Sequence, residues 1–104
     1  MVGALQNLVV LDLSTGVSGP FVTKLLADQG AQVIKVEPPE GDSTRRMAPF
    51  LHEVNKEESS AHFLYLNTNK KSITLDLGTE SGQAVLEKLV EGADLCVENF
   101  SPSQ

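Results

Sequence analysis

The most apolar stretch of the chain runs from Leu8 to Leu13 and ends abruptly in a loop of small residues, Ser14 to Gly19. An apolar run without alternation is typical of a strand that is buried on both faces of a sheet. Pro20 suits the first position of a helix, where its missing N–H costs nothing. A tight turn that opens a helix directs backbone N–H groups and a positive dipole end at one point, which favours an anionic ligand. An ordinary strand-to-helix turn fits the pattern equally well.

The next apolar positions predict a helix and a second strand. Residues from Phe21 to Gln29 carry apolar side chains at helical spacing, and Gly30 provides a stop. The stretch from Ala31 to Val36 then reads as a strand, which Pro38 and Pro39 prevent from continuing. A strand, a helix and a strand in this order form a right-handed crossover between parallel strands.

The second half of the chain repeats this alternation after a long polar loop from Glu40 to Glu58. A short helix capped by Ser59 or Ser60 is expected to reach Leu66, and strict alternation from Ser72 to Leu77 predicts a half-exposed strand. Thr79 is placed to cap a helix from Glu80 to Glu91 that Gly92 closes. The buried stripe of that helix would consist of Val85, Leu86, Leu89 and Val90. The last expected strand runs from Asp94 to Val97.

Alternating strands and helices predict an α/β fold with a mostly parallel sheet and flanking helices. A chain of 104 residues is long enough for one small domain. Because no helix follows the last strand to cover the sheet, we expect residues 1–104 to be the front part of a larger domain.

Composition narrows the function classes. A net charge of −6 argues against a nucleic-acid binder. Five of the eight basic residues nevertheless lie between Arg45 and Lys71, and such a local cationic patch suits a small polyanion or a solvated loop. The start of the chain carries no targeting signal or long apolar run, so we expect a cytoplasmic protein without a membrane segment. A mitochondrial or peroxisomal localisation stays open if the source is eukaryotic.

Few side chains suggest a catalytic or metal site. Cys96 is the single cysteine, and its apolar neighbours favour a buried, inert thiol. His52 and His62 lack ligand-type spacing, so no metal site is expected. Asp12 and Asp76 fall inside predicted strands, where a structural hydrogen-bonding role is favoured over acid–base chemistry.

Three segments converge if the strand assignments hold, because ligands of open parallel sheets bind at the carboxyl ends of the strands. These segments are Ser14 to Gly19, the residues from Glu37 onward, and Glu98 to Ser101. Glu37 lies 21 residues after Gly16, close to the spacing of an acidic residue that holds a ribose diol, but the turn lacks the G-x-G-x-x-G pattern of dinucleotide sites. A solvated Glu37 at a strand end is therefore favoured.

Basic side chains in the following loops have two interpretations each. Arg45 and Arg46 are able to clamp phosphates bidentately, or to be solvated or face acidic neighbours. Asn67, Asn69, Lys70 and Lys71 fit a polyanion site or a plain connection between a helix and a strand. These residues alone predict an α/β domain for a nucleotide-type ligand and specify no reaction.

Four blocks in order, VLDLSTGVSGP, LLADQGAQVIKVEPPEGDSTRR, NTNKKSITLDL and ADLCVENFSP, resemble the N-terminal segment of the family III CoA-transferases. That superfamily includes formyl-CoA transferase, carnitine CoA-transferase and α-methylacyl-CoA racemase. The resemblance extends from about Leu5 to Pro102 and implies a Rossmann-like large domain, an interlocked homodimer, and acyl-CoA and carboxylate substrates. Residues 1–104 would be the N-terminal part of the large CoA-binding domain.

The resemblance also implies a coenzyme A site. Its residues would be Val17 and Ser18 in the first turn, Leu75, Asp76, Leu77 and Gly78 near the adenine end, and Asn99, Phe100 and Ser101. Some members carry an arginine directed at the CoA phosphates where this chain has Pro38, so Arg45 or Lys70 would have to take that role.

The nucleophilic aspartate of such transferases would lie beyond residue 104, which leaves this chain without a catalytic residue and inactive by itself. A CoA-transferase is the favoured function. An acyl-CoA racemase of the same superfamily and a truncated CoA-binding or dimerisation module stay open as alternatives.

Overall fold

The computed structural model describes residues 4–16, 18–47, 50 and 60–99, without the side chain of residue 62. Its elements in chain order are β1 (Val9–Asp12), α1 (Ser18–Asp28), β2 (Gln32–Glu37), the 3-10 helix η1 (Ser43–Arg46), α3 (Ala61–Leu66), β3 (Lys71–Thr74), α4 (Glu80–Glu91) and β4 (Leu95–Val97).

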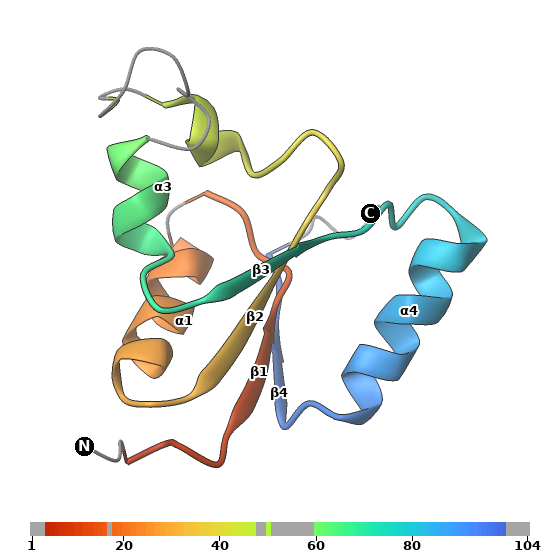
Figure 1. Cartoon of the computed structure of the whole chain (residues 1–104), viewed down its shortest axis with the longest axis horizontal. Helices are drawn as coiled ribbons and strands as arrows, with labels where there is room; N and C mark the ends of the chain where they lie inside the picture. The colour runs from red at the N-terminus through yellow and green to blue at the C-terminus, as the bar shows by residue number, and fades with distance from the viewer. Residues whose placement is uncertain (1–3, 17, 48–49, 51–59, 100–104) are drawn as a thin grey trace.

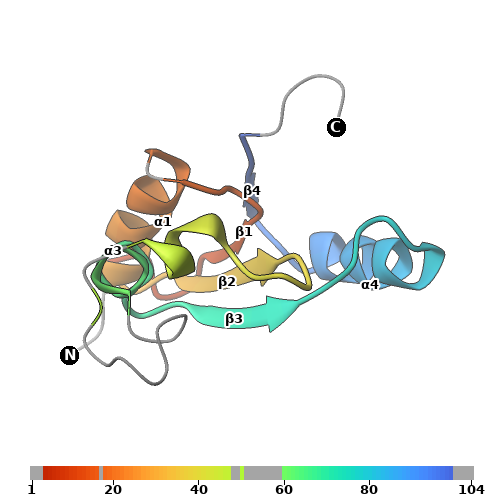
Figure 2. The ribbon, with the colours of Figure 1, turned by 90° about the horizontal axis from the view of Figure 1, so that it is seen from above.

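The four strands form one parallel sheet in the order β3-β2-β1-β4. The chain starts in the middle of the sheet, adds β2 and β3 on one side, and then crosses to the other side of β1 to add β4. Helices α1 and α3 lie on one side of the sheet and α4 lies on the other, as two perpendicular views show (Figures 1 and 2). The α/β fold predicted from the alternation of elements is therefore confirmed.

The central position of β1 explains its apolar sequence. Val10 and Leu11 are completely buried, and Val10 packs with Val33 of β2, with Ala27 in the last turn of α1 and with Ala31 directly before β2. A parallel strand between two others is covered on both faces, so no polar alternation is required. The prediction of a doubly buried first strand is confirmed.

Local sequence signals place several element ends correctly. Helix α4 has the predicted bounds, and Thr79 caps it by accepting a hydrogen bond from the Gly82 N–H. Ser60 caps α3 in the same way, and Gly30 ends α1 with a positive φ of 103°. Helix α1 begins earlier than predicted, at Ser18, so Pro20 is its third residue. This shift is tolerated because N–H groups of the first helical turn have no intrahelical acceptor.

The predicted strand from Ser72 to Leu77 is too long, because β3 ends at Thr74. The Asp76 carbonyl accepts hydrogen bonds from the N–H and hydroxyl of Thr79, and the Asp76 carboxylate accepts one from the Gly78 N–H. These local bonds turn the chain out of the sheet. Placing Asp76 inside a strand was therefore wrong, whereas Asp12 does end β1 and has the expected hydrogen-bonding role.

Two predictions of burial are also wrong. Val85 and Val90 of α4 are 45% and 46% exposed, so only Leu86 and Leu89 of the predicted stripe are half-buried. Cys96 is exposed on β4, which is an edge strand of the sheet. Of the helices in the described ranges, none is long and apolar enough to cross a bilayer.

Candidate functional site

A cleft of about 630 Å³ opens between α4 and the carboxyl ends of the strands, and we call it the α4 cleft. Five segments line it. They are Leu13 and Thr15 after β1, residues 36–40 at the end of β2, residues 75–78 after β3, Gln83 and Leu86 of α4, and Asn99 after β4.

The turn between β3 and α4 forms one wall of this cleft because it is held at both ends. The Leu75 N–H donates to the Glu37 carbonyl, which fixes the start of the turn to β2. The Gln83 side-chain amide donates to the Leu77 carbonyl, which fixes the middle of the turn to α4. At Gly82, a Cβ atom would lie 2.0 Å from the Asp76 carbonyl oxygen, so a glycine is required for this close approach.

The opposite wall of the cleft lies between β1 and β4, where the order of the strands in the sheet reverses direction. Here the Asn99 side chain bridges the two connections. Its Nδ2 donates to the Thr15 carbonyl at 2.7 Å, and its Oδ1 accepts from the Thr15 N–H at 3.1 Å. Ligands of open α/β sheets bind at such a reversal. The structure therefore places a cleft where the topology favours a ligand.

The first turn is not a set of free N–H donors for an anion. The Ser14 N–H donates to the Asp12 carboxylate, and the Thr15 N–H donates to Asn99. The interpretation of this turn as a ready anion site is wrong for these two donors, and the turn instead provides one wall of the cleft.

The charged side chains among the described cleft residues are all acidic: Glu37, Glu40 and Asp76. The remaining lining is apolar or neutral, with Leu13, Leu75, Leu77 and Leu86 as its largest apolar members. Such a surface suits a flat, uncharged group with hydrogen-bond donors better than it suits a phosphate.

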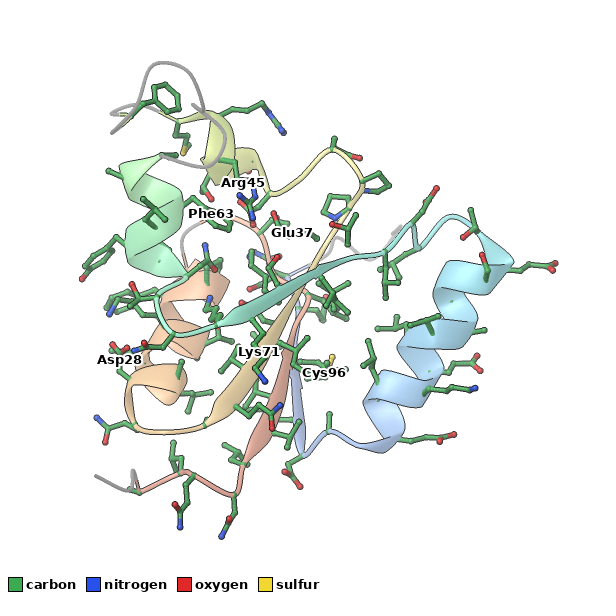
Figure 3. The ribbon with its side chains drawn as sticks, viewed as in Figure 1. Asp28, Glu37, Arg45, Phe63, Lys71 and Cys96 are labelled. Atoms are coloured by element: carbon green, nitrogen blue, oxygen red, sulfur yellow. The ribbon has the colours of Figure 1, made fainter. Side chains whose placement is uncertain are left out.

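Glu37, Arg45 and Phe63 form a stacked cluster beside the cleft (Figure 3). The Arg45 guanidinium donates to both Glu37 carboxylate oxygens at 2.7 and 2.8 Å and lies over the Phe63 ring, 3.8 Å from its centroid. Glu37 also accepts hydrogen bonds from the Ser72 hydroxyl and from the Asp42 N–H.

Glu37 is only 3% exposed, so the favoured interpretation of a solvated residue was wrong. Its burial raises the pKa, but the hydrogen bonds from Arg45, Ser72 and the Asp42 N–H outweigh this effect and lower the pKa to about 2. The alternative that Arg45 faces an acidic neighbour is confirmed.

Lys70 is also engaged inside the protein. Its ammonium donates to the Asp12 carboxylate at 2.9 Å, to the Pro20 carbonyl at 3.0 Å and to Asn67 Oδ1 at 2.7 Å. Burial lowers the pKa of Lys70, and the hydrogen bond to Asp12 opposes this shift. Neither Lys70 nor Arg45 lines the α4 cleft, and their contact with phosphate stays a prediction.

The structure brings five of the predicted site residues together in the α4 cleft: Leu75, Asp76, Leu77, Gly78 and Asn99. Ser18 is exposed at the start of α1 and does not line the cleft. Val17, Phe100 and Ser101 lie outside the described residues. Within the described residues, no group of three or more His, Cys, Asp and Glu side chains is placed to hold a metal ion.

Sequence reasoning placed Thr15 in a segment that borders the ligand but missed Leu13, Val36, Gln83 and Leu86 as cleft residues. Gln83 and Leu86 are three positions apart on α4, so helical periodicity indicated a shared face but not the side of the sheet on which it would lie. Leu13 and Val36 are at strand ends, where the cleft appears only once the strands are paired.

Comparison with known proteins identifies a family that this chain matches. A family model described as CoA-transferase family III matches residues 5–104. The chain is 47% identical over 98 residues to a succinyl-CoA:mesaconate CoA-transferase of Haloarcula hispanica and 45% identical over 102 residues to a formyl-CoA:oxalate CoA-transferase of Streptomyces avermitilis. These matches cover 94% and 98% of this chain but only 25% and 24% of the relatives, so the chain spans about a quarter of their length.

A solved structure agrees with these matches. A CAIB/BAIF family protein from Brucella suis superposes with a TM-score of 0.88 at 44% sequence identity. The superposition covers 96% of this chain and 26% of that protein.

Proposed function

This chain belongs to CoA-transferase family III, and from that premise we propose that it is part of an enzyme that moves coenzyme A from an acyl-CoA donor to a carboxylate acceptor. The observation that carries the proposal is the meeting of residues 75–78 and Asn99 in one cleft at the reversal of strand order. These residues are the ones that the family resemblance implies for coenzyme A, and they come from segments more than twenty positions apart in the sequence.

We propose that the α4 cleft takes the nucleoside end of coenzyme A. Leu13, Leu77 and Leu86 offer apolar surface for the adenine ring, and carboxylate oxygens of Glu40 and Asp76 are acceptors for its amino group or for ribose hydroxyls. Like charges repel, so the CoA phosphates would point away from these carboxylates.

Arg45 and Lys70 are left out of the proposed phosphate contacts. Moving either cation to a phosphate would leave a buried carboxylate, Glu37 or Asp12, without its ion-pair partner. Such an unpaired buried charge is strongly destabilising. Cations for the phosphates would therefore come from other residues of the protein.

Transfer is favoured over racemisation because the two compared relatives are named as CoA-transferases. The acceptors in those names, mesaconate and oxalate, are dicarboxylates, so we propose a small dicarboxylate as the acceptor class.

We also propose a homodimer, which exposed apolar side chains on α1 support: Phe21, Val22 and Leu25 are 39%, 49% and 50% exposed. Sedimentation of the intact gene product as a monomer would contradict the dimer.

The test of the function is a transfer assay with the intact gene product. Succinyl-CoA or formyl-CoA is mixed with mesaconate or oxalate, and new CoA thioesters are identified by mass spectrometry. The proposal predicts a thioester of the acceptor that forms only when donor, acceptor and protein are all present. Inversion of the α-carbon of a 2-methylacyl-CoA without any transfer would instead support the racemase, and binding of CoA without turnover would support a binding module.

A further inference from the structure

Asp12 is completely buried at the carboxyl end of β1 and collects hydrogen bonds from three other residues. Its Oδ1 accepts from the N–H and hydroxyl of Ser14, and its Oδ2 accepts from the Thr23 hydroxyl at 2.7 Å and from the Lys70 ammonium at 2.9 Å. Burial raises the pKa of Asp12, but the Ser14 hydrogen bond, the nearby charge of Lys35 and the remaining donors lower it below its usual value.

Lys70 connects three elements through the same network. A lysine ammonium has three donors, and those of Lys70 reach Asp12 of β1, the Pro20 carbonyl in the first turn of α1, and Asn67 after α3. Its side chain is 1% exposed. Lys70 therefore joins the two ends of the turn between β1 and α1.

A second buried lysine holds the middle of that turn. The Lys35 ammonium donates to the Ser14 carbonyl at 3.3 Å and lies 2.9 Å from the Asp42 carboxylate. The N–H, hydroxyl and carbonyl of Ser14 are thus all bound to buried charged groups. The next residue is Thr15, whose N–H and carbonyl are paired with Asn99 in the α4 cleft.

We propose that Asp12, Thr23 and Lys70 are positioning residues for coenzyme A, because they fix the turn that places Thr15 and Asn99 in the cleft wall. The inference rests on the proposed CoA site. Buried ion pairs contribute little net stability compared with an apolar replacement, and their best-attested use is to specify one conformation. The α4 cleft gains a defined wall from this network, although none of the three residues touches it.

The most selective test replaces Thr23, which is completely buried. Thr23→Val keeps the shape of the side chain but removes the hydroxyl donor to Asp12, whereas Thr23→Ser keeps the donor and loses a methyl group. Titration calorimetry of the intact gene product with CoA should show binding about tenfold weaker in Thr23→Val and within about twofold of wild type in Thr23→Ser. If Thr23 served only to fill space in the core, the loss of its methyl group would matter, and Thr23→Ser would also bind CoA more weakly.

A second variant removes the ion pair as a unit. Asp12→Asn with Lys70→Met leaves no unpaired buried charge, so the fold is expected to persist. Amide hydrogen exchange at Ser14 and Thr15 should accelerate and CoA binding should weaken by about tenfold or more. The matched control is Lys71→Met, an exposed neighbour on β3 that should change neither measurement.

The outcomes separate the two proposals. If wild-type protein does not bind CoA, the proposed function fails, and the exchange of Ser14 and Thr15 still decides whether the network fixes the turn. If wild type binds CoA and both the Thr23→Val and the double variant bind it equally well, the positioning role is overturned. Loss of the fold in both variants, seen by circular dichroism, also overturns it, because the network would then serve folding as a whole.

Discussion

Replacing Glu37 by glutamine measures how much the Glu37–Arg45 ion pair contributes to the unfolding free energy. The substitution keeps the shape of a side chain that is 3% exposed but removes the charge that accepts two hydrogen bonds from Arg45. The pKa of Glu37 falls from 4.5 to about 2 on folding, and each unit is worth about 1.4 kcal/mol, so its ionisation contributes about 3 kcal/mol at neutral pH.

The sign of the pH dependence follows from the lowered pKa. The stabilisation is fully present above the unfolded value of 4.5 and is lost as the pH falls towards the folded value of about 2. Ionisation of Glu37 should therefore contribute about 2 kcal/mol less to the unfolding free energy of wild type at about pH 3 than at about pH 7. Glu37→Gln should show no such loss, because it lacks the carboxyl group. The gap in unfolding free energy between the two proteins should therefore narrow on acidification.

Urea unfolding followed by circular dichroism at the two pH values measures this gap. Glu40→Gln is the matched control, since Glu40 is an exposed carboxylate on the same cleft edge, and its gap should stay within about 0.5 kcal/mol at both pH values. A Glu37→Gln gap of equal size at both pH values would contradict this prediction, because the ionised pair would then contribute nothing specific to the folded state.

Three further predictions address the cleft and its surroundings. Asn99→Ala removes both hydrogen bonds to Thr15, so CoA affinity measured by calorimetry should fall about tenfold while thermal stability changes little; unchanged affinity would contradict the role of Asn99. Gly82→Ala brings a Cβ within 2.0 Å of a backbone oxygen and should lower the unfolding free energy by about 2 kcal/mol or more. Gly92→Ala is its control, because the nearest atom would be 3.9 Å away, and equal losses in both variants would be inconsistent with a steric cause. Cys96 should be alkylated by iodoacetamide with a midpoint above the pH of about 8.5 typical of a free thiol, because partial loss of solvation and the negative charges of Glu98 and Asp12 raise its pKa; a lower midpoint would argue against this environment.

The sequence predicts the elements of this fold best where their ends depend on residues that are close together in the chain. The Thr79 cap and the helical spacing after it predict α4 with its observed bounds. The strict alternation after Lys71 predicted β3 but overran its end, since the hydrogen bonds of Asp76 to Thr79 compete with the ladder. Such competition is hard to see in a pattern of polar and apolar residues, because Asp76 satisfies the alternation and the turn equally well.

Tertiary ion pairs were beyond the reach of the sequence. Arg45 lies eight positions after Glu37, and only the return of the chain through η1 places its guanidinium on that carboxylate. Lys35 was visible as a charge within an apolar strand, but its partner Asp42 lies in a loop without a periodic pattern. Arg45 and Lys70, two of the basic residues that suggested a phosphate site from their clustering, are therefore engaged with carboxylates of the same fold.

Mapping CoA onto the protein by amide chemical shifts is the most direct test of whether the α4 cleft binds coenzyme A. Adding CoA to the isotopically labelled intact gene product should shift the amides of Thr15, Leu77, Gly78, Gln83 and Asn99, which line the α4 cleft from four segments. Lys71 and residues 88–92, which lie outside the cleft lining, should not move. Saturating shifts confined to the cleft residues are the predicted result. Shifts confined to the shallow hollow around Leu5, Leu8 and Asp94, or no shifts at millimolar CoA, would contradict the assignment of this cleft to coenzyme A.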